Sequence, residues 1–117
     1  MKNRENILKT KSYQFALRIV KLYKFLKENQ EFVLSKQILR SGTAIGALVH
    51  ESEYGQSKLD FISKLSIALK EANETDYWLN LLKDSSFISE EAFESVRNDN
   101  QELIKLLISS IKTAKGI

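Results

Sequence analysis

Hydrophobic residues recur at intervals of three and four along most of this chain, which is the spacing that places side chains on one face of an α-helix. Four stretches show this pattern, and short polar stretches separate them. The pattern predicts helices over residues 12–29, 36–54, 57–85 and 90–111. Four amphipathic helices with short connections, about four, two and three residues long, predict an all-α fold. We expect an antiparallel up-down four-helix bundle in one domain over residues 1–117.

Polar residues and a glycine mark where the predicted helices begin and end. Ser12, Ser35, Ser57 and Ser89 each precede a hydrophobic stripe, and serine is a favoured N-cap because its hydroxyl accepts a backbone N–H. Gly55 follows the second stripe, and glycine is favoured in the left-handed conformation that closes many helices. We therefore expect serine caps at all four helix starts and a left-handed glycine after the second helix.

Three segments depart from the hydrophobic pattern. Residues 97–102 are polar, so we expect a kink or partial exposure in the fourth helix. Residues 112–117 are expected to fray, as chain termini commonly do. Residues 1–11 are basic and precede the first predicted cap, so we expect them to form a flexible N-terminal segment.

A run of small residues, 41–47, lies in the middle of the second predicted helix. It includes Gly42 and Gly46, each of which costs about 1 kcal/mol in a helix interior relative to alanine. One interpretation is that the small side chains allow close packing on a neighbouring helix. The other is that Arg40 and the hydroxyl residues of the run form a polar patch that contacts a partner. For the two glycines we favour close packing.

The third predicted helix has hydrophobic residues on two sides. The second line also carries acids, and its members follow one another at intervals of four and three, so they share one face. A helix with two apolar sides is central in a bundle or meets a second subunit. An arginine of the second helix is a candidate ion-pair partner for the acids, within the chain or from another subunit. The candidate interface or ion-pairing residues are Arg40, Ile67, Glu71, Glu74, Trp78 and Leu81.

The composition is that of a globular protein, since the 117 residues are 43% hydrophobic and 28% charged, without cysteine or proline. The lack of cysteine excludes disulfides and fits a reducing compartment, so we expect a cytoplasmic protein. No apolar run approaches the roughly 18 residues that a membrane-spanning helix needs, and no membrane partner is expected.

Charge is distributed unevenly along the chain. The net charge is +3, but residues 1–27 contain eight lysines or arginines and a single acid, Glu5, so this stretch carries +7 and the remainder −4. Such asymmetry is typical of a surface that faces a polyanion. The alternative is a solvated helix face that meets acidic helices of its own bundle or of a neighbour. The candidate phosphate-contacting residues are Lys9, Lys11, Arg18, Lys21 and Lys24, with Lys2 and Arg4 before them.

Residues that could carry catalysis or bind a metal are few. His50 is the only histidine, and a metal site would need several ligands at suitable spacing. No phosphate-binding loop, dinucleotide-binding glycine pattern or nucleophile motif occurs. A hydrolase that uses the paired acids Glu71 and Glu74 is a further hypothesis, although acid pairs on bundles more often form ion pairs. We expect no cofactor, no metal and no enzymatic activity.

Several motifs carry a resemblance to a known family. They are RSGTAIGA at 40–47, DF at 60–61, KLSIALKEA at 64–72, ET at 74–75 and YWL at 77–79. These motifs resemble those of the four-helix-bundle proteins of the 23S rRNA intervening-sequence family. The sequence departs from the family pattern at Leu48, where asparagine is usual, and at His50, where glutamate is usual. Both departures weaken the transfer of a polar site at that end of the second helix.

The resemblance implies a ribosomal-protein-like bundle that assembles as a homopentamer, in a family encoded within intervening sequences of bacterial 23S rRNA genes or elsewhere in genomes. Nucleic-acid binding has been proposed for the family. A related group, the accessory variability proteins of diversity-generating retroelements, is similar in form and binds nucleic acid and a reverse transcriptase. We therefore expect a non-enzymatic homo-oligomer that binds RNA or DNA backbones through its first helix. The alternative is a scaffold for a protein partner such as a nucleic-acid enzyme.

Overall fold

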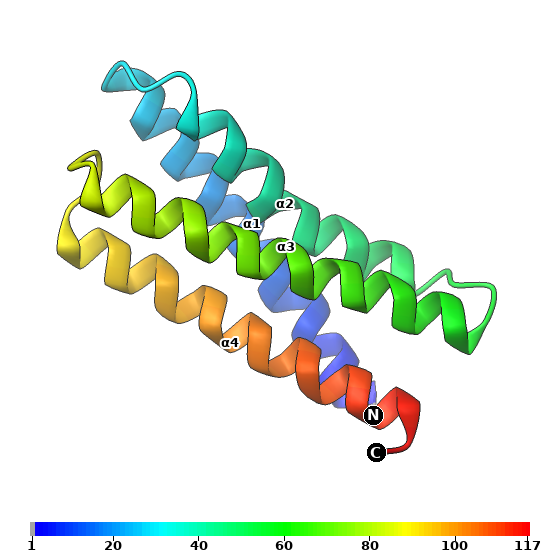
Figure 1. The fold of residues 1–117 in the computed structure, drawn as a ribbon. Helices are drawn as coiled ribbons and strands as arrows, with labels where there is room; N and C mark the ends of the chain where they lie inside the picture. Colours follow the sequence, from blue (N-terminus) through cyan, green and yellow to red (C-terminus); the bar gives the residue numbers. More distant parts are fainter. Residues whose placement is uncertain (1) are drawn as a thin grey trace.

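The computed structural model describes residues 2–117, with side chains from residue 7 onward. The described chain forms four α-helices arranged as an up-down bundle (Figure 1) of 44 × 22 × 19 Å. Each helix packs against its neighbours in sequence, and the first also contacts the fourth, which closes the bundle. This arrangement confirms the predicted fold. The helices are α1 (Lys2–Glu28), α2 (Leu34–Ser52), α3 (Lys58–Asp84) and α4 (Glu90–Lys115).

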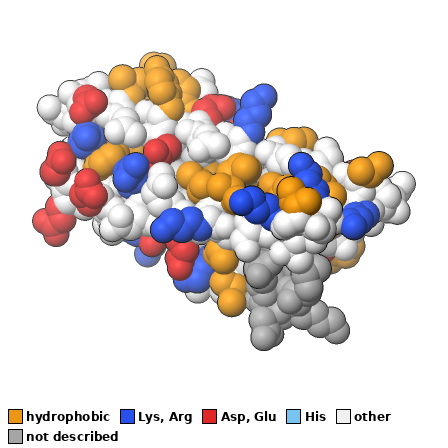
Figure 2. Space-filling model, turned by 60° about the horizontal axis from the view of Figure 1, so that its bottom comes forward, with side chains coloured by type: hydrophobic (Ala, Val, Ile, Leu, Met, Phe, Trp, Pro, Cys, Tyr) orange, Lys and Arg blue, Asp and Glu red, His pale blue; other side chains and the backbone are white. Residues whose placement is uncertain are grey.

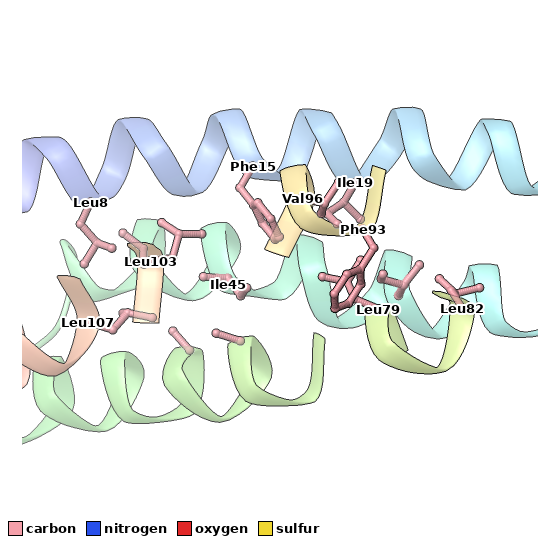
Figure 3. Close-up of a cluster of buried hydrophobic side chains, with 14 of the residues drawn as sticks. Leu8, Phe15, Ile19, Ile45, Leu79, Leu82, Phe93, Val96, Leu103 and Leu107 are labelled. Carbon is pink, nitrogen blue, oxygen red and sulfur yellow. The ribbon is translucent and has the colours of Figure 1, made fainter. Parts of the chain in front are cut away.

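The core runs along the bundle axis, where the hydrophobic stripes of all four helices meet (Figure 3). The stripe of α2, for example, buries Ile38, Ile45 and Val49, which the helical spacing predicted. Burial of a large aliphatic side chain contributes about 1.5–3 kcal/mol, so these stripes provide the main driving force for the bundle. The core residues labelled in Figure 3 are Leu8, Phe15, Ile19, Ile45, Leu79, Leu82, Phe93, Val96, Leu103 and Leu107.

The two glycines of α2 lie where this helix packs closely on α1. A Cβ atom at Gly42 would lie 2.7 Å from Cγ1 of Ile19, and one at Gly46 would lie 3.0 Å from the carbonyl oxygen of Ser12. Real Cβ contacts are essentially never as short as 2.7 Å, and a contact of 3.0 Å to a backbone atom is tighter than nine in ten of them. A side chain at either position would therefore require the neighbouring helix to shift. The close-packing interpretation of the small-residue run is therefore confirmed.

The start of α1 differs from the prediction. Ser12 is not an N-cap, because the helix already begins at Lys2. Ser12 is buried inside the helix, and its hydroxyl donates to the carbonyl oxygen of Lys9 at 3.1 Å. Leu8 is also buried in the core, so the hydrophobic stripe continues one turn beyond the serine. Residues 2–11, expected to precede the helix, are part of it.

The start of α2 also differs, because a glutamate replaces the expected serine cap. Val33 occupies the N-cap position and its side chain makes no capping hydrogen bond. The carboxylate of Glu31 accepts the backbone N–H of Ser35 at 2.6 Å and that of Val33 at 3.3 Å. Ser35 is buried within the first turn of the helix. The long side chain of Glu31 thus folds back to satisfy N–H groups that a helix start leaves free.

The serine caps of α3 and α4 are confirmed. Ser57 accepts the backbone N–H of Asp60 at 3.0 Å, and Ser89 accepts that of Ala92 at 3.0 Å. Five residues connect each pair of successive helices, so the connections are longer than the four, two and three residues predicted.

The left-handed residues are not where the sequence predicted them. Gly55 has no positive φ; α2 ends through Glu53, whose conformation is right-handed. In the other two turns, Gln30 (φ 66°) and Ser86 (φ 65°) are left-handed. Glycine is favoured there but not required. At Gly55 an added Cβ would lie 3.2 Å from the carbonyl oxygen of Ser52, so this glycine permits a close backbone approach.

The two irregular segments of α4 are helical. Residues 97–102 belong to one continuous helix, and Asn100 within them is fully buried, its amide donating to the carbonyl oxygen of Ala72 at 2.9 Å. The helix is thus uninterrupted, and the other expectation, partial exposure, is confirmed, because Asn98 and Glu102 are exposed while Asn100 makes a buried polar contact to α3. Residues 112–117 were expected to fray, but the helix continues to Lys115 and ends at left-handed Gly116 (φ 79°).

Candidate nucleic-acid interface

Three of the five basic residues predicted to contact phosphates form ion pairs within the chain. Lys9 Nζ lies 3.2 Å from Glu53 Oε2, and Lys11 Nζ lies 3.1 Å from Glu102 Oε1. Arg18 Nη1 lies 2.6 Å from Asp99 Oδ2. For these three residues the structure supports the alternative interpretation, in which the basic stretch meets acidic groups of its own bundle.

Arg18 is the most firmly held of the three. Besides Asp99, its guanidinium donates to the carbonyl oxygen of Ser95 at 3.3 Å and to the hydroxyl of the same residue at 3.0 Å. These contacts join α1 to α4 along the side of the bundle. Because the group is partly exposed, the pair is worth little to stability, but it orients the guanidinium.

Lys21 and Lys24 are the candidates whose charge remains available. Both side chains are exposed, and neither forms an ion pair among the residues that the structure describes. Further along α1, Lys27 Nζ lies 5.3 Å from the ring centroid of Tyr23. The side chains of Lys2 and Arg4 lie outside the described residues. The second half of α1 therefore carries the free positive charge of this surface.

A groove opens beside Lys21, between α1 and the turn that joins α3 to α4. It has a volume of about 1060 Å³. In Figure 1 the second half of α1 diverges from α4 toward the end of the bundle that carries that turn. Hydrophobic side chains, including Leu22 and Val96, line it together with cations. The charged groups along it are Arg18, Lys21, Lys83 and Glu90.

Lys83 and Phe87 belong to this groove and were not among the predicted site residues. Lys83 lies in the last turn of α3. The helix dipole favours a cation there whatever its neighbours are, so a lysine at this position does not by itself indicate a binding site. Its Nζ lies 4.2 Å from the ring centroid of Phe93. No sequence signal places either residue beside α1, because the two segments are far apart in the chain and only the closure of the bundle brings them together.

Figure 2 shows one face of the molecule on which Lys and Arg side chains lie among hydrophobic ones, while most acidic side chains gather toward its left end. Exposed hydrophobic and basic groups are thus neighbours on the surface. A surface of this kind can contact both the charged and the apolar parts of a ligand.

The second predicted cluster, around Arg40, is an ion-pair network within one chain. Arg40 Nη1 lies 3.2 Å from Glu71 Oε1, and its Nη2 pairs with Glu74 Oε2. The indole Nε1–H of Trp78 donates to the same Glu74 oxygen at 2.9 Å. Arg40 therefore finds its predicted acids on α3 of its own chain.

The hydroxyl groups near Arg40 are engaged inside the bundle. The hydroxyls of Thr75 and Ser41 are hydrogen-bonded to each other at 2.9 Å, and that of Thr75 also contacts the carbonyl oxygen of Glu71 at 2.8 Å. Thr43 donates to the carbonyl oxygen of Leu39 in its own helix at 2.6 Å. Ser41 is fully buried and joins α2 to α3, so it is not part of an exposed polar patch, whereas Thr43 is half-buried.

The hydrophobic members of the second line on α3 are partly accessible. Ile67 is 42% exposed, and Trp78 and Leu81 are half-buried. Tyr77, next to Trp78, is exposed, and the two rings meet edge to face with centroids 5.0 Å apart. The apolar stripe of α3 is thus exposed at Ile67 and at Tyr77, and the ion pairs of Arg40 with Glu71 and Glu74 interrupt it between them.

The described residues offer no constellation for metal chemistry. No group of three or more histidine, cysteine, aspartate or glutamate side chains is placed to hold a metal ion within this part of the chain. His50 is exposed and packs edge to face against Tyr54, with ring centroids 5.5 Å apart. None of the helices described is long and apolar enough to cross a membrane.

Comparison with known proteins identifies the family. The family model of the 23S rRNA-intervening sequence protein matches residues 4–109. A crystal structure of a protein with unknown function from the S23 ribosomal protein family of Bacteroides thetaiotaomicron VPI-5482 is 61% identical and superposes with a TM-score of 0.92, over 93% of this chain and 98% of that one. No curated protein matches the chain. The chain therefore belongs to the 23S rRNA-intervening sequence protein family.

Proposed function

We propose that this protein is a non-enzymatic, homo-oligomeric bundle that binds RNA or DNA through its basic face, defined as Lys21 and Lys24 of α1. The observation that carries the proposal is the exposure of Lys21 and Lys24 without acidic partners among the described residues. Exposed lysines on a rigid helix can neutralise phosphates, and the counterions that are released favour binding.

The homo-oligomer is part of the same proposal. It rests on the resemblance to a pentameric family and on the apolar stripe of α3 around Ile67 and Tyr77, both of which are exposed in the single chain. Exposed apolar stripes commonly mark interaction sites. In a homopentamer the basic face would occur five times, so weak contacts to one polyanion would combine through avidity.

The proposal assigns no reaction to the protein. Glu71 and Glu74, the acids considered for a hydrolase, both pair with Arg40, and this pairing favours a structural role. We also propose that the protein acts in the cytoplasm, in keeping with a sequence that lacks cysteine.

The first test measures fluorescence anisotropy of a labelled structured RNA and a duplex DNA across a salt series. Steep salt dependence is expected. The double variant Lys21→Glu/Lys24→Glu should weaken binding and lower the magnitude of the salt slope by about one for each phosphate that is no longer neutralised. Arg18 is left unchanged, because a glutamate there would face Asp99 and disturb the bundle.

The control is Lys58→Glu/Lys70→Glu, which changes the net charge equally at two exposed positions of α3. If both double variants weaken binding to the same extent, net charge rather than the basic face determines affinity. If neither changes it, the surface assignment is wrong.

A second candidate function, a scaffold for a protein partner, is favoured by one observation. Tyr13 and Leu17 are exposed on α1 and line a second groove of about 460 Å³ beside Gly46 and His50 of α2. An exposed aromatic and an aliphatic side chain beside a concave surface suit a protein contact. Absence of polyanion binding at low salt would favour this function over the first.

A further inference from the structure

The groove beside Lys21 contains two accessible aromatic rings. Phe25, from α1, is 47% exposed, and Phe87, from the turn between α3 and α4, is 38% exposed. A globular protein normally buries phenylalanine, and here two from distant parts of the sequence line one concave surface. Neither ring belongs to the hydrophobic core, which other residues of the chain form.

Both rings are attached to hydrogen-bonded backbone. Phe25 is part of α1. Phe87 follows the left-handed Ser86, and its backbone N–H donates to the carbonyl oxygen of Leu82 at 2.9 Å. An aromatic side chain on a fixed backbone loses little conformational entropy when a ligand covers it.

Lys21 supplies positive charge beside these rings. It lines the groove together with Arg18, Lys83 and one acid, Glu90. Arg18 pairs with Asp99, and Lys83 Nζ lies 3.7 Å from Asp84 Oδ1, whereas Lys21 forms no ion pair among the described residues. Aromatic faces interleaved with positive charge form the surface that proteins use for single-stranded nucleic acids, in which bases stack on the rings and phosphates meet the cations. In a duplex the bases are already stacked on one another and cannot reach such rings.

From this arrangement we infer that the groove binds single-stranded nucleic acid, with bases stacked on Phe25 and Phe87 and the backbone held along Lys21. The inference rests on the proposed function and narrows it, because the basic face alone would bind any polyanion. Selectivity for unpaired strands comes from the aromatic rings, and the lysines add affinity that depends on salt.

The test compares three ligands: a labelled oligouridylate, a duplex RNA of the same length, and inorganic polyphosphate as a competitor that has no bases. The wild-type protein should bind oligouridylate about tenfold more tightly than the duplex. Polyphosphate at equal charge should compete poorly for the bound oligouridylate.

The variant Phe25→Leu/Phe87→Leu keeps apolar side chains in the groove but removes the aromatic faces. It should weaken oligouridylate binding about tenfold and leave duplex binding unchanged. The matched control is Phe32→Leu, at a ring that is 49% exposed in the turn between α1 and α2 and outside the groove. This control should bind like the wild type, and circular dichroism verifies that all variants are folded.

The outcomes separate the two proposals. If all three ligands bind equally and Phe25→Leu/Phe87→Leu has no effect, the single-strand inference is overturned while polyanion binding stands. If no ligand binds at low salt, the proposed function fails, and the inference fails with it. A loss of binding in Phe32→Leu equal to that in the double variant also overturns the inference, because the groove would then have no special role.

Discussion

Gly42 lies at the closest approach between α1 and α2, where its missing side chain allows the contact with Ile19. Two effects oppose each other at this position. Alanine is the better helix former by about 1 kcal/mol, but its methyl group would lie 2.7 Å from a side-chain atom that is fully buried. A buried neighbour has no free space to move into, so the clash should exceed the gain in helix propensity.

We expect Gly42→Ala to lower the free energy of unfolding by about 1–3 kcal/mol, the range for overpacked cores. Urea denaturation measures it. Ala47→Gly lies at an exposed position of the same helix, so it measures the difference in helix propensity between alanine and glycine without a change in core packing. The variant Gly42→Ala/Ile19→Ala removes both γ carbons that the new methyl group would meet, so its loss should be smaller than the sum of the two single losses. A Gly42→Ala protein as stable as the wild type would show that the helices do not pack this closely.

At the same scale, neighbouring basic residues of α1 have different roles. Arg18 and Lys21 are three positions apart and equally plausible as phosphate contacts from the sequence. The structure pairs Arg18 with Asp99 and leaves Lys21 without an acid among the described residues. The difference depends on α4, which is far away in the chain, so no local pattern could reveal it.

At the scale of the helices, hydrophobic periodicity predicted the buried faces of the helices well and the residues at which they begin and end less well. Ser57 and Ser89 cap their helices as predicted. Ser12 and Ser35 are instead buried among core residues, where a small side chain permits close packing of α1 against α2 and its neighbours. A serine before a hydrophobic stripe is therefore compatible with two roles, and only the packing distinguishes them.

The start of α2 depends on Glu31. We expect Glu31→Ala to lower the free energy of unfolding by about 1–2 kcal/mol, because removing a side-chain cap costs up to this amount. Hydrogen exchange should accelerate at Val33 and Ser35, whose N–H groups the carboxylate accepts. The control, Glu28→Ala, removes an exposed acid from the end of α1. Equal losses in the two variants would contradict the capping role.

At the scale of the whole molecule, the apolar stripe of α3 bears on the proposed assembly. We expect the wild-type protein to elute as a homo-oligomer in size-exclusion chromatography with light scattering. Ile67→Glu should shift it toward smaller species, because it places a charge in an apolar contact. Leu59→Glu provides the matched control, since Leu59 is 79% exposed in the first turn of the same helix.

Two results would contradict this interface. A wild-type monomer at micromolar concentration would remove the homo-oligomer from the proposal. Dissociation by Leu59→Glu, with none by Ile67→Glu, would place the contact elsewhere on the molecule.

The sequence by itself determined the number of helices, their order and the buried stripes, because these follow from the 3.6-residue period within each segment. The motifs that indicate the family also lie in the sequence, and the comparisons confirm that family. Only the tertiary structure decided which charges are paired and where a concave surface forms. Arg18 meets Asp99, and Lys21 shares a groove with Lys83 and Phe87, because closing the bundle brings together segments that are distant in the chain.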